Sequence, residues 1–178
     1  MMMNNYRAEM IAAISRLVEI PSVFAESSDY PFGPQVDHCL DVTLAMMKDL
    51  GFRTFKAPDG MYGYAETGEG ELFGVLCHLD VVPARQEDGW EHDPFRPMVQ
   101  GDWLCGRGTQ DDKGPSVAAI YALKSLLDEG RKLNKRVRFI FGIDEETMWK
   151  SIHAYCDREE LPVSGFVPDS TFPLTYAE

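Results

Sequence analysis

LFGVLCHLD, residues 72–80, is a strongly apolar segment that ends in polar side chains. A short apolar run of this kind predicts a strand that is buried on both faces of a sheet. RVRFIFGI, residues 136–143, is a second such run and leads directly into three acidic residues, Asp144, Glu145 and Glu146. Two strands buried in this way imply a sheet that is covered by helices.

The segments around these two runs have helical or strand-like patterns. Apolar residues at helical spacing predict helices over residues 5–18, 36–50 and 148–157, and a further helix that Pro115 opens at its first position and Gly130 ends. Turn sequences separate β-favouring runs, which predicts neighbouring strands at 52–56, 62–66 and 72–76 and a last strand at 163–167. Residues 83–108 are predicted to form a long irregular loop.

Helices that alternate with buried strands predict an α/β fold, with a mixed, largely parallel sheet flanked by helices. A length of 178 residues suits a single globular domain. Functional side chains are expected at the carboxyl ends of the strands.

The charge of the chain excludes some partners. There are 29 Asp and Glu residues against 17 Lys and Arg residues, which gives a formal net charge of −12. A body this negative should repel nucleic acid and anionic membranes. The N-terminus lacks the pattern of a signal peptide, and no apolar run is long enough to span a membrane, so a cytoplasmic location is predicted.

Cysteine usage agrees with that location. Four cysteines lie far apart and form no CxxC pair, which predicts reduced thiols that pack as small buried side chains rather than as ligands: Cys39, Cys77, Cys105 and Cys156.

The first polar cluster is His78 and Asp80, which lie two residues apart and therefore on one side of the strand end. A carboxylate beside an imidazole can orient the ring and fix its tautomer, as it does around metal-bound histidines. An ordinary hydrogen-bonded pair has the same pattern, so the cluster alone does not distinguish a metal site from such a pair.

The second cluster is GRGTQDDKGP, residues 106–115. Neither phosphate-binding motif fits, because Asp111 and Asp112 stand where a dinucleotide-binding loop and a P-loop need glycine. Glycines beside adjacent carboxylates at a helix start suit a cation instead. Capping of the following helix is the alternative, chiefly for Asp112.

Two further acidic clusters follow strands. Crowded carboxylates at 144–146 cost folding free energy unless a cation compensates them or one stays protonated. Adjacent residues leaving a strand point in different directions, so one glutamate can hold a metal while its neighbour acts as a general base. Asp169, in Pro-Asp-Ser, is the fourth cluster. The alternative for residues 144–146 is a solvated acidic turn, and the alternative for Asp169 is an Asx-turn.

Taken together, one imidazole and several carboxylates at strand ends form the ligand set of a hydrolytic two-metal centre. Zinc accepts this mixture of nitrogen and oxygen ligands, as do manganese and cobalt.

Five motifs in a fixed order distinguish this sequence from a generic α/β protein. They are CHLDVVPA, GWEHDPFRP, GDWLCGRGTQDDKGP, FIFGIDEET and GFVPDSTFPLTYAE. They resemble the M20 family of co-catalytic zinc metallopeptidases and, within it, the bacterial PepV-like dipeptidases of Xaa-His or beta-Ala-His type. The resemblance covers essentially the whole chain. It implies a zinc-peptidase-like catalytic domain, two Zn²⁺ ions per complete site and a dipeptide or short peptide as substrate.

The resemblance also implies the roles of individual residues. His78 would bind one zinc and Asp80 would orient it, while Asp111 would bridge both ions. Glu145 would be the general base that takes a proton from water and returns it to the leaving amine. Glu146 would bind one zinc and Asp169 the other, and the motif residues Arg107 and Asp112 would support the loop.

Members of this family are considerably longer. By resemblance, residues 1–178 correspond to the N-terminal portion of the catalytic domain. The lid or dimerisation domain would then be absent, as would the C-terminal catalytic segment, which supplies a last metal-binding histidine. Two alternatives remain: a fragment that binds metal without turnover, and another M20 hydrolase such as an N-acyl amino acid deacylase or desuccinylase. The sequence does not specify an oligomeric state.

Overall fold

The computed structural model describes residues 6–170. The helices are α1 (Arg7–Val18), α2 (Pro34–Asp49), α3 (Lys113–Asp128) and α4 (Lys150–Arg158), with a 3-10 turn η2 at Gln86–Asp88. The strands are β1 (Arg53–Lys56), β2 (Gly63–Thr67), β3 (Leu72–His78), β4 (Met98–Gln100), β5 (Trp103–Cys105), β6 (Arg136–Gly142) and β7 (Ser164–Phe166). The start of the first predicted helix at residue 5 and the end of the last motif, residues 171–178, lie outside the described residues.

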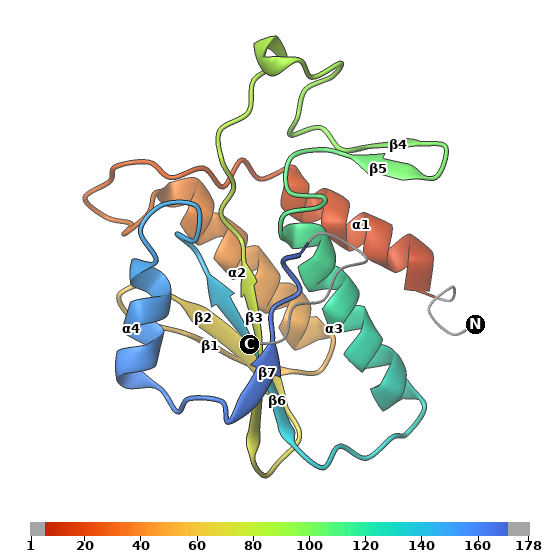
Figure 1. Cartoon of the computed structure of the whole chain (residues 1–178), viewed down its shortest axis with the longest axis vertical. Coiled ribbons are helices and arrows are strands. Elements are labelled where there is room, and N and C mark those ends of the chain that lie inside the picture. The colour runs from red at the N-terminus through yellow and green to blue at the C-terminus, as the bar shows by residue number, and fades with distance from the viewer. Residues whose placement is uncertain (1–5, 171–178) are drawn as a thin grey trace.

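Five strands form one sheet in the order β1-β2-β6-β3-β7 (Figure 1). β2 is antiparallel to both β1 and β6, whereas β3 is parallel to both β6 and β7. Within this sheet all strands except β2 therefore run in the same direction, which confirms the prediction of a mixed, largely parallel sheet.

The prediction that β2 and β3 are neighbours is wrong, because β6 lies between them. The turn at Gly68–Gly70 joins β2 to β3 along the chain, but the residues of a turn do not determine whether the two strands pair with each other or with a third strand. β6 is almost wholly buried, and its register places Val75 beside Phe139 and Cys77 beside Phe141. Apolar burial thus places this strand at the centre of the sheet.

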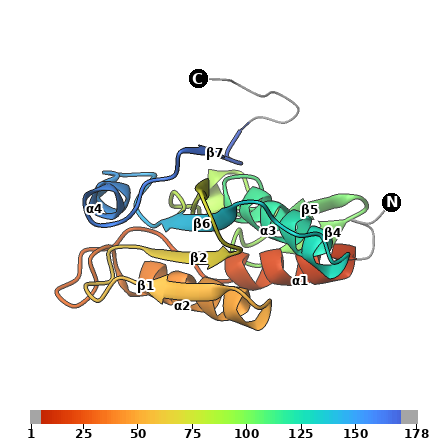
Figure 2. The same cartoon turned by 90° about the horizontal axis from the view of Figure 1, so that it is seen from below.

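The alternation of side chains along β6 separates two apolar layers. Phe139 and Phe141 face the large core formed with α1, α2 and α3, whereas Ile140 faces a smaller cluster with Ala154 and Tyr155 of α4. Helices consequently cover both faces of the sheet, with α2 and α4 on opposite sides (Figure 2).

Three details differ from the sequence prediction. α3 begins at Lys113, so Pro115 lies within its first turn and not at its first position; proline is tolerated there because those amides have no partner within the helix. The segment 83–108 contains η2 and the β4–β5 hairpin. All four cysteines are free, but only Cys39 and Cys77 are buried.

In the part of the chain that the structure describes, no helix is long and apolar enough to cross a membrane.

Candidate metal centre

The predicted site residues gather at the carboxyl ends of the parallel strands. His78 ends β3, Glu145 and Glu146 follow β6, and Asp169 follows β7. Asp111 comes from the loop that leads into α3. Parallel strands place their carboxyl ends along one edge of a sheet, so segments far apart in sequence meet there.

The ring of His78 is held in one orientation. Its side chain is only 4% exposed, and Nδ1 lies 3.0 Å from the main-chain carbonyl oxygen of Asp80. A carbonyl only accepts hydrogen bonds, so Nδ1 carries a proton and donates it. This leaves Nε2 as the nitrogen that faces the acidic cluster.

Nε2 of His78 lies 2.8 Å from Oδ1 of Asp111 and 3.5 Å from Oδ2 of Asp169. A lone pair on Nε2 would repel both carboxylates. A proton or a metal cation must therefore be shared among these atoms. The side chain of Asp111 is 52% exposed, so this side of the centre is open to solvent.

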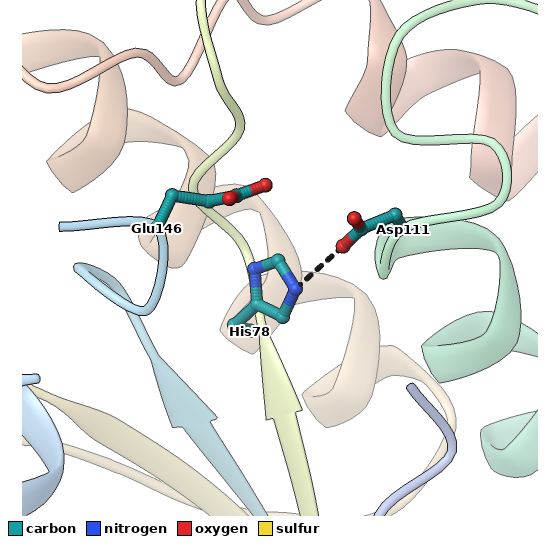
Figure 3. Close-up of side chains that lie close together, drawn as sticks. All are labelled: His78, Asp111 and Glu146. Carbon is teal, nitrogen blue, oxygen red and sulfur yellow. Dashed lines mark hydrogen bonds and ion pairs between the residues drawn. The ribbon is translucent and has the colours of Figure 1, made fainter. Parts of the chain in front are cut away.

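Glu146 completes a group of candidate ligands. One ligand atom each from His78, Asp111 and Glu146 lies within 4.8 Å of the other two. In Figure 3, the side chains of Glu146 and Asp111 extend from the left and the right of the view to the space above the ring of His78, and the dashed line joins Nε2 to Asp111. The donor set of one imidazole and carboxylate oxygens fits zinc, manganese or cobalt.

Asp80 acts mainly on the loop after β6. Its carboxylate is 2% exposed and accepts hydrogen bonds from the backbone N–H groups of Glu145 and Glu146, each at 3.0 Å. The same carboxylate lies 3.6 Å from Nδ1 of His78, farther than the main-chain carbonyl that receives the Nδ1 proton. Asp80 thus fixes the two glutamates as well as the environment of the ring.

The acidic surroundings shift the pKa values of the site. Burial disfavours the imidazolium form, but the carboxylates of Asp80, Asp112 and Glu145 outweigh burial and raise the pKa of His78 to about 10. Burial and neighbouring carboxylates raise the pKa of Glu145 and that of Glu146 above their usual values. A cation at the centre would relieve this crowding of negative charge.

Asp144, the first of the three consecutive acids, has a structural task. It is 1% exposed, and its carboxylate accepts hydrogen bonds from the backbone N–H groups of Lys150 (2.7 Å) and Ser151 (2.9 Å) at the start of α4. The chain between them turns through Trp149, which has a φ of 58°, an uncommon value for a bulky residue. The capping role separates Asp144 from Glu145 and Glu146.

The side chain of Asp112 does not cap the following helix, which is the alternative role that the sequence allows for it. It is fully buried, and no hydrogen bond from its side chain caps α3. Oδ2 instead accepts hydrogen bonds from the backbone N–H of His78 (3.2 Å) and the hydroxyl of Ser116 (2.8 Å). Burial raises the pKa of Asp112 to about 7. Sequence reasoning missed these contacts, because nothing in the motif predicts a bond to the main chain of β3.

A cavity of about 30 Å³ adjoins the centre. Its lining includes the polar side chains of His78, Glu145 and Asp169 as well as Trp149 and Ile152. Glu145 therefore faces a small space beside the candidate ligands, where a water molecule fits.

Comparison with known proteins identifies similar sequences. Residues 74–172 match the sequence profile of Peptidase family M20/M25/M40. The chain is 42% identical to "Putative dipeptidase SH1171" of Staphylococcus haemolyticus over 177 residues and to "Putative dipeptidase YtjP" of Bacillus subtilis over 176 residues. Each alignment covers 97% of this chain and 37% of the relative, so the chain spans little more than a third of their length.

Solved structures share the fold. Human carnosine dipeptidase 1 superimposes with a TM-score of 0.77 at 23% identity, covering 92% of this chain and 39% of that protein. The M20 family metallo-carboxypeptidase Sso-CP2 of Sulfolobus solfataricus gives a TM-score of 0.72 at 22% identity, with coverages of 90% and 37%.

Proposed function

The chain belongs to peptidase family M20/M25/M40, and on that basis we propose that its acidic centre takes part in metal-dependent hydrolysis of dipeptides or short peptides. The names of the bacterial relatives support a dipeptide substrate over an acylated amino acid. The net charge of −12 fits a small-molecule substrate better than a nucleic acid or an anionic membrane.

One observation carries the proposal. Nε2 of His78 faces two carboxylates that can only accept hydrogen bonds, and Nδ1 already donates to a carbonyl oxygen. An arrangement of this kind stabilises a cation at Nε2. The proposed ligands are His78, Asp111, Glu146 and Asp169.

Two zinc ions are the proposed complement, with manganese and cobalt as alternatives. When bound, divalent ions supply Lewis acidity for the scissile carbonyl group and for the attacking water. Asp111 is the proposed shared ligand of both ions. Its exposed side chain places this ligand at the open side of the centre, where a peptide has access.

Glu145 is the proposed general base. It lines the small cavity with His78 and Asp169, and burial raises its pKa above the usual range. A carboxylate with a raised pKa is a better proton acceptor near neutral pH. Glu145 would take a proton from the attacking water and deliver it to the leaving amine, while Asp80 holds its main chain in place.

The test is dipeptide hydrolysis by this 178-residue chain. We expect activity that a chelator abolishes, that added Zn²⁺, Mn²⁺ or Co²⁺ restores, and that Glu145→Gln lowers by at least about a hundredfold. Glu69→Gln is the matched control, because Glu69 is exposed in the turn at the opposite end of β3. Full activity in Glu145→Gln would exclude the general-base role.

Two other outcomes separate the alternatives. Tight metal binding without turnover of any dipeptide would favour a chain that binds metal but is inactive. Faster hydrolysis of N-acyl amino acids than of dipeptides in the same assay would favour a deacylase within the family.

A further inference from the structure

Asp112 is a buried carboxylate next to the candidate ligands, and it is not one of them. Asp112 follows the proposed shared ligand Asp111 and is fully buried. Its Oδ2 atom is used by two donors, the backbone N–H of His78 and the hydroxyl of Ser116. A side chain enclosed and occupied in this way is poorly placed to bind a metal itself.

The other oxygen of Asp112 is incompletely satisfied. Among the described residues, Oδ1 is buried without a hydrogen-bond partner. The adjacent Lys113 does not compensate it, because its ammonium group donates instead to the carbonyl oxygens of Leu17 (2.8 Å) and Ile20 (3.0 Å). A buried carboxylate that accepts no hydrogen bond from a cationic side chain destabilises a fold.

The hydrogen bond to His78 connects this charge to the centre. The backbone N–H at the end of β3 is fixed by Asp112, while the ring of the same residue is fixed by the carbonyl of Asp80. His78 is thus held at both its main chain and its side chain. A negative charge behind the ring would also favour a cation at Nε2.

We propose that Asp112 is a positioning residue of the metal centre: it fixes the main chain of His78, and its buried charge strengthens cation binding at Nε2 without contacting the metal. The inference rests on the proposed function, since it requires that the centre binds a metal. It predicts opposite effects of the charge on the metal-free and metal-bound chain. The charge should destabilise the former and stabilise the latter.

The test is made at pH 8, above the pKa of about 7 that burial gives Asp112, so that this carboxylate is charged. It uses Asp112→Asn, whose amide oxygen can still accept both hydrogen bonds while the charge is removed. Zn²⁺ affinity is measured by competition with a chromophoric chelator, and the unfolding midpoint of the metal-free chain is measured by urea titration. We expect a loss of at least about tenfold in Zn²⁺ affinity, with a metal-free midpoint equal to or above that of the unmodified chain.

Ser116→Ala is the matched variant, because it keeps the charge and removes one hydrogen-bond donor. We expect it to lower the metal-free midpoint while Zn²⁺ affinity stays within about threefold of the unmodified chain. The Ser116→Ala measurement can be made even if Asp112→Asn does not fold. An affinity loss of about tenfold or more in Ser116→Ala would show that packing around Asp112, and not its charge, sets the Zn²⁺ affinity, and would overturn the inference.

Three further results would overturn it. Unchanged Zn²⁺ affinity in Asp112→Asn would exclude the electrostatic contribution while leaving the proposed function standing. A lower metal-free midpoint in Asp112→Asn, parallel to its affinity loss, would reduce Asp112 to a purely structural residue. Failure of the unmodified chain to bind Zn²⁺ would overturn the proposed function and this inference together.

Discussion

The carboxylate of Asp80 accepts a hydrogen bond from the backbone N–H of Glu145 at 3.0 Å, and its second oxygen accepts one from the next residue. This contact joins the end of β3 to the loop after β6. The proposed base and a proposed ligand therefore share one anchor, which comes from the same strand end as the histidine.

Replacing this anchor should destabilise the chain. In Asp80→Asn one carboxylate oxygen becomes an NH₂ group that cannot accept from a backbone N–H, so one amide loses its charged partner. We expect the free energy of unfolding to fall by about 2 kcal/mol, the usual value of a hydrogen bond to a charged group. Urea unfolding measures this loss against Glu69→Gln, and equal stabilities of the two variants would refute the role of Asp80 as an anchor.

The stability of the metal-free chain should depend on pH through His78. Its pKa is about 10 in the folded chain, against 6.5 for an unperturbed histidine, so the folded state holds this proton more tightly. The stabilisation is complete below pH 6.5 and is lost as the pH rises towards about 10.

Urea unfolding of the chelator-treated chain at the two ends of this range checks the pH prediction. Other groups titrate in the same range, so the comparison is with His78→Gln, which should show a smaller decrease in stability. The same decrease in both proteins would mean that His78 does not hold a proton as expected.

A buried arginine should stabilise both the pairing of β6 with β2, through an ion pair, and the contact of the sheet with α4. Arg138 is 4% exposed; its guanidinium donates to Glu66 at 2.9 Å and to the hydroxyl of Tyr155 at 3.1 Å, and it lies 4.0 Å from the ring centroid of Tyr64. Glu66→Ala leaves this cation only the more distant carboxylate of Glu159, at 3.9 Å. We expect a loss of about 3 kcal/mol in the free energy of unfolding.

Arg53→Ala is the control for that prediction. Arg53 contacts the same glutamate at 3.3 Å, but its side chain is 61% exposed. Its removal should cost less than about 1 kcal/mol. Similar losses in the two variants would show that burial does not set the strength of the interaction with Glu66.

Sequence patterns predicted the elements better than their arrangement. The apolar runs located β3 and β6 because burial on both faces leaves a continuous apolar signature. The order of the strands was only partly predictable, since the insertion of β6 beside β2 is a long-range pairing. The β4–β5 hairpin was missed because strands as short as Met98–Gln100 show no clear period.

For the site, the sequence located which clusters meet but not how they are held. The positions of His78, Glu146 and Asp169 after parallel strands were enough to predict one common edge. The tasks of Asp80 and Asp112 depend on hydrogen bonds to backbone N–H groups of distant segments. Such bonds leave no pattern in the sequence, because every residue except proline carries the same donor.

His78 and Asp111 are proposed to hold a divalent metal between them, and anomalous scattering from crystals of the chain soaked in Zn²⁺ would locate that metal. The predicted result is an anomalous peak about 2.0–2.2 Å from Nε2 of His78 and from a carboxylate oxygen of Asp111. A map with no peak at these two atoms, or with zinc bound only elsewhere on the chain, would exclude His78 and Asp111 as metal ligands.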